Sequence, residues 1–386
     1  MSSRSDRRPL HVGLDLIFLG GRAGGVGRHA YELPPALLAE EPGLALTCFV
    51  GSAAPEALLK SSWAADVRWV HFPVAATSRL HLLAQLAAMP ALAAARGIDV
   101  LHSLANTGPW WSPRVARVLT LHDLLFVTQG ADWNPDARAR RVTAALALGA
   151  ARRADRVIAV SEYAARQLAE IGEIDRGRID VVPGGAPESS RVAPSAESDM
   201  RTRLGIGAAP FALCVAQKRR YKNQAALVRA LAELPPPLSL VLPGERTPYE
   251  DEVRAEASRL GVEDRVRLID WVSEADLEAL YAAASCVALP SLEEGFGLPV
   301  LEAMVRGVPV ICSGGGAMAE VAGDAALLVD PRDHRSIAGA VERILGDPTL
   351  AADLARLGRE RAAAFTWRRA AQGTLAVYRR ALARPQ

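Results

Sequence analysis

The 386-residue sequence predicts an α/β protein with two doubly wound domains, each built on a parallel β-sheet. Short apolar, β-rich runs alternate with alanine-rich runs along the chain, the pattern of parallel strands joined by helical crossovers. The length exceeds what one ordinary hydrophobic core accommodates. The alternation is interrupted between Gly184 and Ala209 by a stretch rich in Pro, Ser, Gly and Ala, a composition typical of a linker.

Seven strands are expected before this linker, each a short apolar run bounded by polar or turn residues. They are His11–Leu16, Leu46–Val50, Val67–His71, Val100–His102, Val118–Leu121, Arg156–Val160 and Ile179–Val182. Alanine-rich helices are expected between them at Arg28–Ala39, Leu80–Ala95, Pro135–Ala151 and Glu162–Ile171.

The same alternation restarts after the linker. Strands are expected at Phe211–Ala216, Leu238–Leu242, Val266–Asp270, Cys286–Pro290, Val308–Cys312 and Ala326–Val329. A helix at Lys222–Leu234 follows the first of these strands, and further helices lie between the others. The last segment, from Phe365 to Arg384, has the pattern of an amphipathic helix. We therefore expect domains at 1–190 and 191–365, followed by a helical tail at 366–386.

Composition excludes several classes of protein. Hydrophobic residues make up 50% and charged residues 23%, which is a globular balance, and the net charge of +2 does not favour nucleic acid or an anionic membrane. Cys48, Cys214, Cys286 and Cys312 lie in apolar runs without a C-x-x-C pair, so buried free thiols in a reducing cytoplasm are expected, without a metal. The N-terminus lacks a signal-peptide pattern, and Leu80–Ala95 is too short to span a bilayer, so membrane contact would be peripheral at most.

Two glutamates, Glu294 and Glu302, bracket a glycine-containing loop that follows an apolar run expected to be a buried strand. Pro299 suits the first turn of a helix, so Glu294 would lie in the loop and Glu302 in the first helical turn. Gly295 and Gly297 allow the backbone to approach a ligand closely. Two carboxylates at this spacing can accept hydrogen bonds from the hydroxyls of a sugar or ribose, although acidic residues also favour helix starts for electrostatic reasons.

The segment Glu294–Glu302 resembles the E-x7-E motif of retaining glycosyltransferases in the glycogen-synthase-like, group 1 family. The resemblance implies the GT-B fold, in which two Rossmann-like domains face each other across a ligand-binding cleft. It also implies that Glu302 contacts the nucleotide ribose. The residues that it places against the donor sugar are Glu294, Gly295, Phe296, Gly297 and Leu298.

A glycine-rich segment, Gly20–His29, lies between the first expected strand and the first helix. It does not match the dinucleotide-binding G-x-G-x-x-G pattern in context, but free N–H groups at a helix N-terminus suit a phosphate or a closely placed sugar. A similar loop in the family lies beside donor and acceptor, which makes Gly25, Gly27 and Arg28 candidate binding residues. A flexible turn is the alternative.

The pair His122 and Asp123 follows the strand expected at Val118–Leu121. A histidine titrates near neutrality and can donate or accept a hydrogen bond at a sugar hydroxyl or leaving phosphate. Thr120–Asp123 resembles the family's T-x-H-D segment, in which the histidine lies close to the reacting carbon of the donor. A histidine with a structural role is the alternative.

A basic cluster, Val215–Asn223, follows the first strand of the second half. Its cations can neutralise a diphosphate beside a helix N-terminus. Lys222 and the asparagine after it match the family's K-N pair, whereas Ala216 and Gln217 stand where an upstream arginine is expected, so Lys218 or Arg219 is a candidate substitute. A solvated basic turn or weak nucleic-acid binding is the alternative. Gly244 and Val272 fall where the family surrounds the nucleotide base and phosphates.

The combined prediction is a cytoplasmic, metal-independent, retaining glycosyltransferase with no cofactor other than a nucleotide-diphosphate sugar as co-substrate. The T-L-H-D and K-N segments slightly favour GDP-mannose over a UDP- or dTDP-sugar. The acceptor would be a glycan, a lipid-linked glycan or a small molecule. An epimerase or phosphorylase of the same architecture, or a non-catalytic nucleotide-sugar sensor, is the alternative. The oligomeric state is left open.

Overall fold

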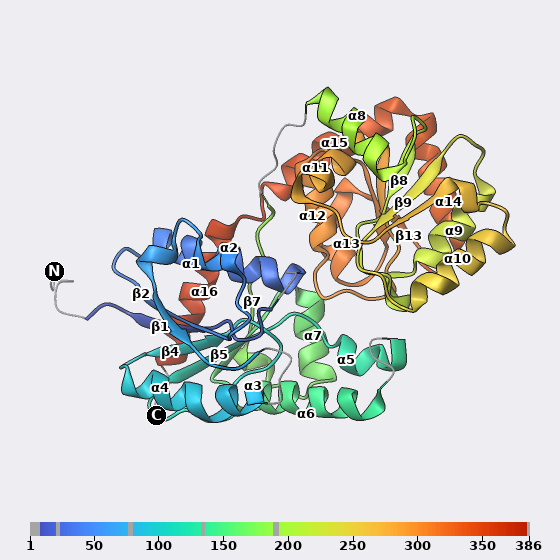
Figure 1. Cartoon of the computed structure of the whole chain (residues 1–386). Coiled ribbons are helices and arrows are strands. Elements are labelled where there is room, and N and C mark those ends of the chain that lie inside the picture. The colour runs from blue at the N-terminus through green and yellow to red at the C-terminus, as the bar shows by residue number, and fades with distance from the viewer. Residues whose placement is uncertain (1–7, 21–23, 76–79, 133–135, 188–192, 384–386) are drawn as a thin grey trace. The chain divides into compact units, whose positions relative to one another are not determined.

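A computed structural model describes residues 8–20, 24–75, 80–132, 136–187 and 193–383, which form two compact units (Figure 1). Unit 1 comprises the chain up to Leu124, Arg138–Gly185 and the chain from Thr366 onward. Unit 2 comprises Leu125–Ala137 and Ala186–Phe365. The sequence division placed Leu125–Ala137 in the N-terminal domain; in the structure Gln129 of this segment donates a hydrogen bond to Glu293, and the segment belongs to unit 2.

Unit 1 is built on a seven-stranded parallel sheet with strand order β3-β2-β1-β4-β5-β6-β7. The strands are β1 His11–Asp15, β2 Ala45–Val50, β3 Arg68–His71, β4 Val100–Ser103, β5 Ala116–Leu121, β6 Arg156–Ala159 and β7 Ile179–Val181. The principal helices are α1 Gly25–Glu40, α4 Met89–Ala95, α6 Ala137–Arg153, α7 Glu162–Glu170 and α16 Trp367–Leu382, with short helices α2 Glu56–Leu59 and α3 Leu80–Leu83 and a π-helical turn Ala84–Ala88.

The last helix, α16, packs beside α1 and β5 although it is more than 240 residues away from either along the chain (Figure 1). Its apolar face contributes Ala371, Leu375 and Tyr378 to the same core as β1 and β2. This core position explains the strong amphipathic pattern of the tail, because a single face of the helix is buried.

Unit 2 is built on a six-stranded parallel sheet with strand order β10-β9-β8-β11-β12-β13. The strands are β8 Phe211–Leu213, β9 Ser239–Pro243, β10 Val266–Ile269, β11 Cys286–Leu289, β12 Val310–Ser313 and β13 Leu327–Val329. The helices are α5 Leu125–Thr128, α8 Pro194–Leu204, α9 Gln224–Glu233, α10 Tyr249–Arg259, α11 Glu274–Ala283, α12 Leu298–Val305, α13 Gly316–Ala322, α14 His334–Gly346 and α15 Pro348–Ala362.

The predicted α/β class with two doubly wound parallel sheets is confirmed, and each expected strand overlaps an observed one. The linker prediction is wrong over Pro194–Leu204, which forms α8. This helix begins with Pro194 in its first turn and ends at Gly205, whose φ of +63° is left-handed. Met200 is buried in the core of unit 2, and Leu204, the last residue of the helix, is partly buried against the same core.

The expected helix at Lys222–Leu234 starts two residues later than predicted. A 3₁₀ turn at Arg220–Lys222 and the left-handed Asn223 precede α9. All four cysteines are buried and unpaired, and burial raises the pKa of each thiol to about 12. Within the described ranges, no helix is long and apolar enough to cross a bilayer, and no group of three or more His, Cys, Asp or Glu side chains is arranged to hold a metal ion.

Candidate active site

Three predicted binding residues of unit 2 follow three neighbouring strands of its sheet. Lys222 follows β8, Gly244 follows β9 and Glu294 follows β11, and β8 lies between the other two strands. Because these strands are parallel, their carboxyl ends meet at one edge of the sheet. The structure therefore gathers these segments at the position where doubly wound sheets bind ligands.

The ammonium of Lys222 forms an ion pair with Glu294, with 2.5 Å between Nζ and Oε1. Both side chains are largely buried, 15% and 14% exposed. Burial alone would lower the pKa of Lys222, but the carboxylate of Glu294 and neighbouring Tyr221 outweigh it, so the pKa is raised. Lys222 therefore keeps its positive charge in a poorly solvated position, where its field is weakly screened.

Asn223 fixes the loop that carries Lys222. Its backbone is left-handed, with φ of +62°, and its side-chain Nδ2 donates to the carbonyl oxygens of Pro290 at 3.0 Å and Pro331 at 2.7 Å. The N–H of Leu292 donates to the carbonyl of Tyr221 at 2.7 Å. Loops after β8, β11 and β13 are thereby joined through one side chain, whose role is hidden in the sequence because its two partners are 67 and 108 residues away.

The loop between the two glutamates ends at Gly297, whose φ of +104° and close approach to Met318 require glycine. A Cβ there would lie 2.9 Å from Cγ of Met318. Helix α12 starts at Leu298 with Pro299 in its first turn, as expected, but Glu302 is the fifth residue of the helix and lies at the start of the second turn.

Glu302 is only 7% exposed and accepts a hydrogen bond from the hydroxyl of Tyr281 on α11, 2.8 Å from Oε2. Burial, and then the adjacent Glu302 carboxylate, raise the pKa of Tyr281 well above its ordinary value, so the phenol stays a donor. Arg306, one turn after Glu302, donates to its carbonyl at 2.7 Å and lies 4.7 Å from the centroid of the Tyr281 ring. The sequence analysis did not find Tyr281, since nothing in the pattern of α11 separates it from an ordinary core residue.

Lys218 has a different environment from Lys222. Its side chain has no exposed surface, its ammonium donates to the carbonyls of Gly244 and Ile269, and Nζ lies 3.6 Å from Glu250. Burial lowers the pKa of Lys218, although Glu250 and Asp270 oppose this shift. In this structure Lys218 joins the loops after β8, β9 and β10 and does not present its charge to solvent.

Gly244 lies at the centre of these joined loops, with φ of +145°. A Cβ would lie 2.1 Å from the carbonyl oxygen of Ala216, so no other residue fits without movement. The remaining predicted residues of unit 2 lie around the same edge: Gly295 is buried, Arg219, Phe296, Leu298 and Val272 are half-buried, and the rings of Phe296 and Phe365 are 6.0 Å apart.

In unit 1, His122 follows β5 and is held by the loop after the neighbouring strand β4. Its main-chain N–H donates to Oδ1 of Asn106 at 2.9 Å, and its Nε2 lies 2.8 Å from the carbonyl oxygen of Leu104. A carbonyl only accepts, so Nε2 carries the proton and Nδ1 of the neutral ring is an acceptor. Asp123, the next residue, is half-buried.

The rings of His29 on α1 and His122 lie edge to face, with centroids 5.4 Å apart, and His29 meets Trp367 of α16 in the same way at 5.2 Å. Burial lowers the pKa of His122, partly opposed by the hydrogen bond to Leu104, and lowers that of His29 further. Behind them, His102 bonds Tyr378 and Thr120, and burial lowers its pKa to about 3. The sequence analysis included His29 as the last residue of the glycine-rich segment but gave it no role, because nothing local separates it from an ordinary helical residue.

Helix α1 begins at Gly25, and its N-cap, Gly24, provides no side-chain capping bond. Gly25 is exposed, Gly27 is buried and Arg28 is half-buried. Among the described residues, the N-cap of this sixteen-residue helix provides no side-chain bond to its first N–H groups, an arrangement that favours anions. Residues 21–23 of the glycine-rich segment lie outside the described residues.

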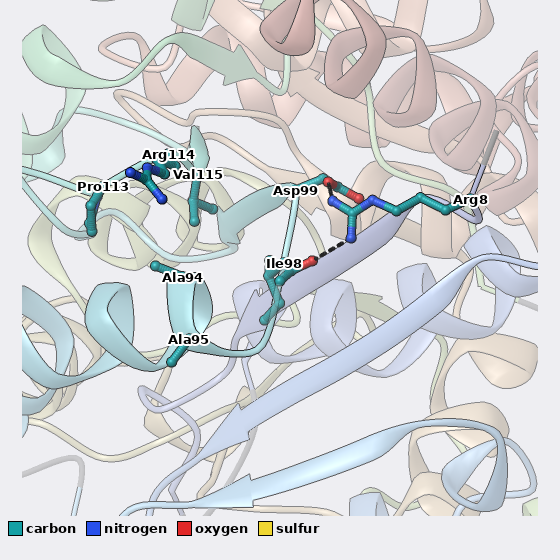
Figure 2. A pocket seen from close by; sticks show the side chains of 9 residues that line it. Arg8, Ala94, Ala95, Ile98, Asp99, Pro113, Arg114 and Val115 are labelled. Carbon is teal, nitrogen blue, oxygen red and sulfur yellow. Dashed lines mark hydrogen bonds and ion pairs between the residues drawn. The ribbon is translucent and has the colours of Figure 1, made fainter.

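A cavity of about 570 Å³ lies elsewhere in unit 1, where β4 and β5 begin (Figure 2). Figure 2 shows Arg8 reaching Asp99 at one end and Pro113, Arg114 and Val115 at the other. This cavity contains none of the predicted site residues and lies at the amino ends of the strands, opposite the edge that carries His122.

Comparison with known proteins agrees with the predicted fold. Residues 197–361 match the family "Glycosyl transferases group 1" and residues 23–189 match "Glycosyltransferase Family 4". The sucrose-phosphate synthase of Thermosynechococcus elongatus superposes with a TM-score of 0.74 at 24% identity, covering 96% of this chain and 98% of that one. The predicted GT-B class of two Rossmann-like domains is therefore confirmed.

Two curated relatives are informative. The D-inositol 3-phosphate glycosyltransferase of a Nocardioides strain is 30% identical over 402 aligned positions, 94% of this chain and 86% of the relative. The O-antigen chain mannosyltransferase B of Escherichia coli is 36% identical over 174 positions, 44% of this chain and 45% of the relative. The chain belongs to the group 1 glycosyltransferases, a family of retaining hexosyltransferases that use nucleotide sugars. The predicted family and enzyme class are confirmed.

Proposed function

We propose that this enzyme transfers a hexose, with GDP-mannose favoured as donor over a UDP- or dTDP-sugar, to a hydroxyl of a glycan, a lipid-linked glycan or a small molecule. The proposal rests above all on the charged, poorly solvated Lys222 held by Glu294 at the carboxyl edge of the unit 2 sheet. A cation in this position suits the diphosphate of a nucleotide sugar.

Lys222 and backbone N–H groups of the surrounding loops would stabilise the negative charge that develops on the leaving diphosphate. Binding of the diphosphate would draw Lys222 from Glu294 and release that carboxylate for the hydroxyls of the donor sugar. Glu302 would accept from the ribose with the carboxylate already oriented by Tyr281. Gly295, Phe296, Gly297 and Leu298 would complete the sugar site, and Gly244 and Val272 the nucleotide site.

For retention, the acceptor would attack the face of the sugar from which the diphosphate leaves, through an oxocarbenium-like state. Glu294 would position the sugar and not attack it, because its carboxylate, once released from Lys222, would accept hydrogen bonds from the hydroxyls of the donor sugar. On the acceptor side, the bare N-terminus of α1 at Gly25, Gly27 and Arg28, together with His122 and Asp123, would meet the reacting groups.

The preference for mannose is supported by the T-L-H-D and K-N segments and by the similarity to the E. coli mannosyltransferase. The Nocardioides relative, which aligns with 94% of this chain, is named for D-inositol 3-phosphate. A small phosphorylated molecule is therefore a further candidate acceptor. An epimerase, a phosphorylase or a non-catalytic sensor of the same fold would differ in its products, and each predicts a separate result in the assays below.

The test is the thermal stability of the purified protein with UDP, GDP, dTDP and ADP and their common sugars. A nucleotide at about 100 times its Kd stabilises the native state by about 2.7 kcal/mol. We expect a selective increase in Tm with one nucleotide, absent in Lys222→Ala. Lys60→Ala is the matched control, because Lys60 is an exposed residue of unit 1 whose described ion pair is with the equally exposed Glu56. Failure of every nucleotide to raise Tm would contradict the proposal.

Turnover separates the remaining alternatives. Incubation of the selected donor should release nucleoside diphosphate slowly by hydrolysis and faster with an acceptor, and the product should keep the donor's anomeric configuration. Sugar isomerised without an acceptor would indicate an epimerase, and strict dependence on phosphate a phosphorylase. Unchanged nucleotide binding in Glu294→Ala, with no turnover of any donor by the native enzyme, would indicate a sensor.

A further inference from the structure

Three aromatic side chains of unit 1 form a small polar niche, which we call the imidazole niche: His29 on α1, His122 after β5 and Trp367 at the start of α16. Their rings contact in sequence, His122 with His29 and His29 with Trp367, at centroid separations of 5.4 and 5.2 Å. His29 is 5% exposed. All three segments belong to the same compact unit.

The hydrogen-bonding capacity of the niche is largely unused. Among the described residues, the ring nitrogens of His29 have no hydrogen-bonding partner, and Nε1 of Trp367 is buried without one. His122 uses Nε2 on the Leu104 carbonyl, which leaves Nδ1 as an acceptor. Buried polar groups are usually satisfied, so three adjacent rings with unused capacity indicate a position where another molecule supplies the partners.

The niche is also uncharged near neutral pH. Burial lowers the pKa of both His29 and His122, so each ring is neutral and has one donor and one acceptor nitrogen. Trp367 adds a donor only. A sugar hydroxyl is uncharged, donates and accepts, and matches this mixed set. A phosphate group is anionic and consists mainly of acceptor oxygens, which would place like partial charge against Nδ1 of His122.

Nearby elements provide a contrast. The uncapped N-terminus of α1, one helical turn before His29, favours anions through its N–H groups and dipole. His29 lies further along the same helix, where the rings that it contacts are those of His122 and Trp367. One end of α1 would thus suit a phosphate, and the niche would suit an uncharged group next to it.

We propose that His29 is a hydroxyl-binding residue of the acceptor side, and that the imidazole niche selects an uncharged carbohydrate hydroxyl over a phosphate group. This inference rests on the proposed glycosyl transfer and narrows its acceptor to one that presents a sugar hydroxyl at this position. His29 would orient that hydroxyl beside His122, and Trp367 would donate to it or to a neighbouring oxygen.

The experiment uses the full chain labelled with ¹⁵N-histidine, with the imidazole signals followed by NMR in the presence of the bound nucleotide. The probes are methyl α-D-mannopyranoside and inorganic phosphate at equal concentrations. We expect the glycoside to shift the His29 and His122 signals in a saturable way and phosphate to leave them unchanged. A phosphate-induced shift without a glycoside-induced one, or no response to the glycoside up to its solubility, would overturn the inference.

Two variants sharpen the result. His29→Phe keeps a ring against His122 and Trp367 but removes both nitrogens, and should weaken glycoside binding about tenfold, the value of one lost hydrogen bond. His29→Gln keeps a donor and an acceptor and should bind the glycoside more tightly than His29→Phe. If His29→Phe does not fold, His29→Gln replaces it as the test of the His29 side chain. His71→Ala, an exposed position at the end of β3, is the control. Unchanged glycoside affinity in His29→Phe would refute the role of His29.

Failure of the inference is distinguishable from failure of the proposed function. Nucleotide stabilisation depends on Lys222 in unit 2 and should survive in His29→Phe. Loss of the glycoside response with intact nucleotide binding and turnover would reject only the niche. Absence of nucleotide binding in the native protein would reject the proposed function itself.

Discussion

The side chain of Asn223 joins three loops of the proposed donor site. Asn223→Asp tolerates the left-handed backbone, since short polar residues adopt it readily, but replaces a donor by an acceptor opposite the carbonyls of Pro290 and Pro331. We expect the free energy of unfolding to fall by about 2–4 kcal/mol, the cost of leaving buried polar groups unpaired. Urea unfolding measures this, and nucleotide affinity should fall with it.

Asn223→Gly is the matched comparison, because glycine accepts φ of +62° without strain and removes the amide without adding charge. It should destabilise less than Asn223→Asp, and the difference isolates the repulsion between the carboxylate and the carbonyls. Native stability and native nucleotide affinity in Asn223→Asp would mean that the amide does not hold these loops.

At this scale the sequence predicts residue types better than their partners. The basic cluster after β8 predicts the diphosphate cation, and this role of Lys222 stays a prediction. The structure shows Lys222 paired with Glu294 at the sheet edge. Four residues earlier, Lys218 has the same chemistry but lies among main-chain carbonyls. Lys218 is buried because it contacts Gly244, Ile269 and Glu250. No local sequence pattern links these three residues to Lys218.

Strand-end loops in unit 2 are packed against each other so closely that glycine is required. In Gly244→Ala the new Cβ would lie 2.1 Å from the Ala216 carbonyl oxygen, so the loops after β8 and β9 must separate. We expect a loss of about 3 kcal/mol or more of stability, in the range of severe backbone and overpacking changes, and loss of the nucleotide-induced increase in Tm.

Gly205→Ala is the control for this change. Gly205 also has positive φ, +63°, but nothing lies within 4 Å of an added Cβ. Only backbone strain then applies, about 1 kcal/mol, and nucleotide binding should be retained. Equal losses in the two variants, measured by urea unfolding, would show that the contact between the loops is unimportant.

At the scale of elements, the sheets could be predicted because buried parallel strands are near-continuous apolar runs, such as Cys286–Leu289. Helix α8 could not be predicted, because Pro194 and Gly205 give its largely polar sequence the composition of a linker. Its contacts with the core, through Met200 and Leu204, form no long apolar pattern. The Tyr281–Glu302 bond was also beyond prediction, because it joins two helices that pack only after the sheet has formed.

Over the whole molecule, titration should affect the two units unequally. Burial lowers the pKa of His11, His29, His102 and His122, all in unit 1. Unfolding restores ordinary values near 6.5, so the unfolded chain takes up more protons as pH falls below that value. These histidines therefore do not change the free energy of unfolding above about pH 7. Below that, they lower it progressively as the pH falls toward their pKa in the folded protein, which is about 3 for His102.

We expect the free energy of unfolding of unit 1 to fall between pH 7 and 5 by up to about 1.4 kcal/mol per pH unit for each such proton. Burial raises the pKa of Asp15, so the folded protein binds this proton more tightly than the unfolded chain does. As the pH falls toward about 4, Asp15 therefore raises the free energy of unfolding, opposite to the histidines. Hydrogen exchange at pH 7.5 and 5.5 should show faster opening in β4 and β5 of unit 1. His102→Gln should reduce this dependence, and His334→Gln in unit 2 should not; equal acid sensitivity of both units would contradict the expectation.

The placement of α16 has a consequence for the order in which the protein is completed during synthesis. Most of unit 1 precedes unit 2 along the chain and is made before it, but the core of unit 1 includes Tyr378 and its niche includes Trp367, which both follow unit 2. Unit 2 is finished at Phe365, before either has emerged. Of the two units, unit 1 begins synthesis first but can complete its fold only after unit 2 has been made. Until α16 is synthesised, His102 lacks its hydrogen-bonding partner Tyr378 and one face of the unit 1 sheet is uncovered.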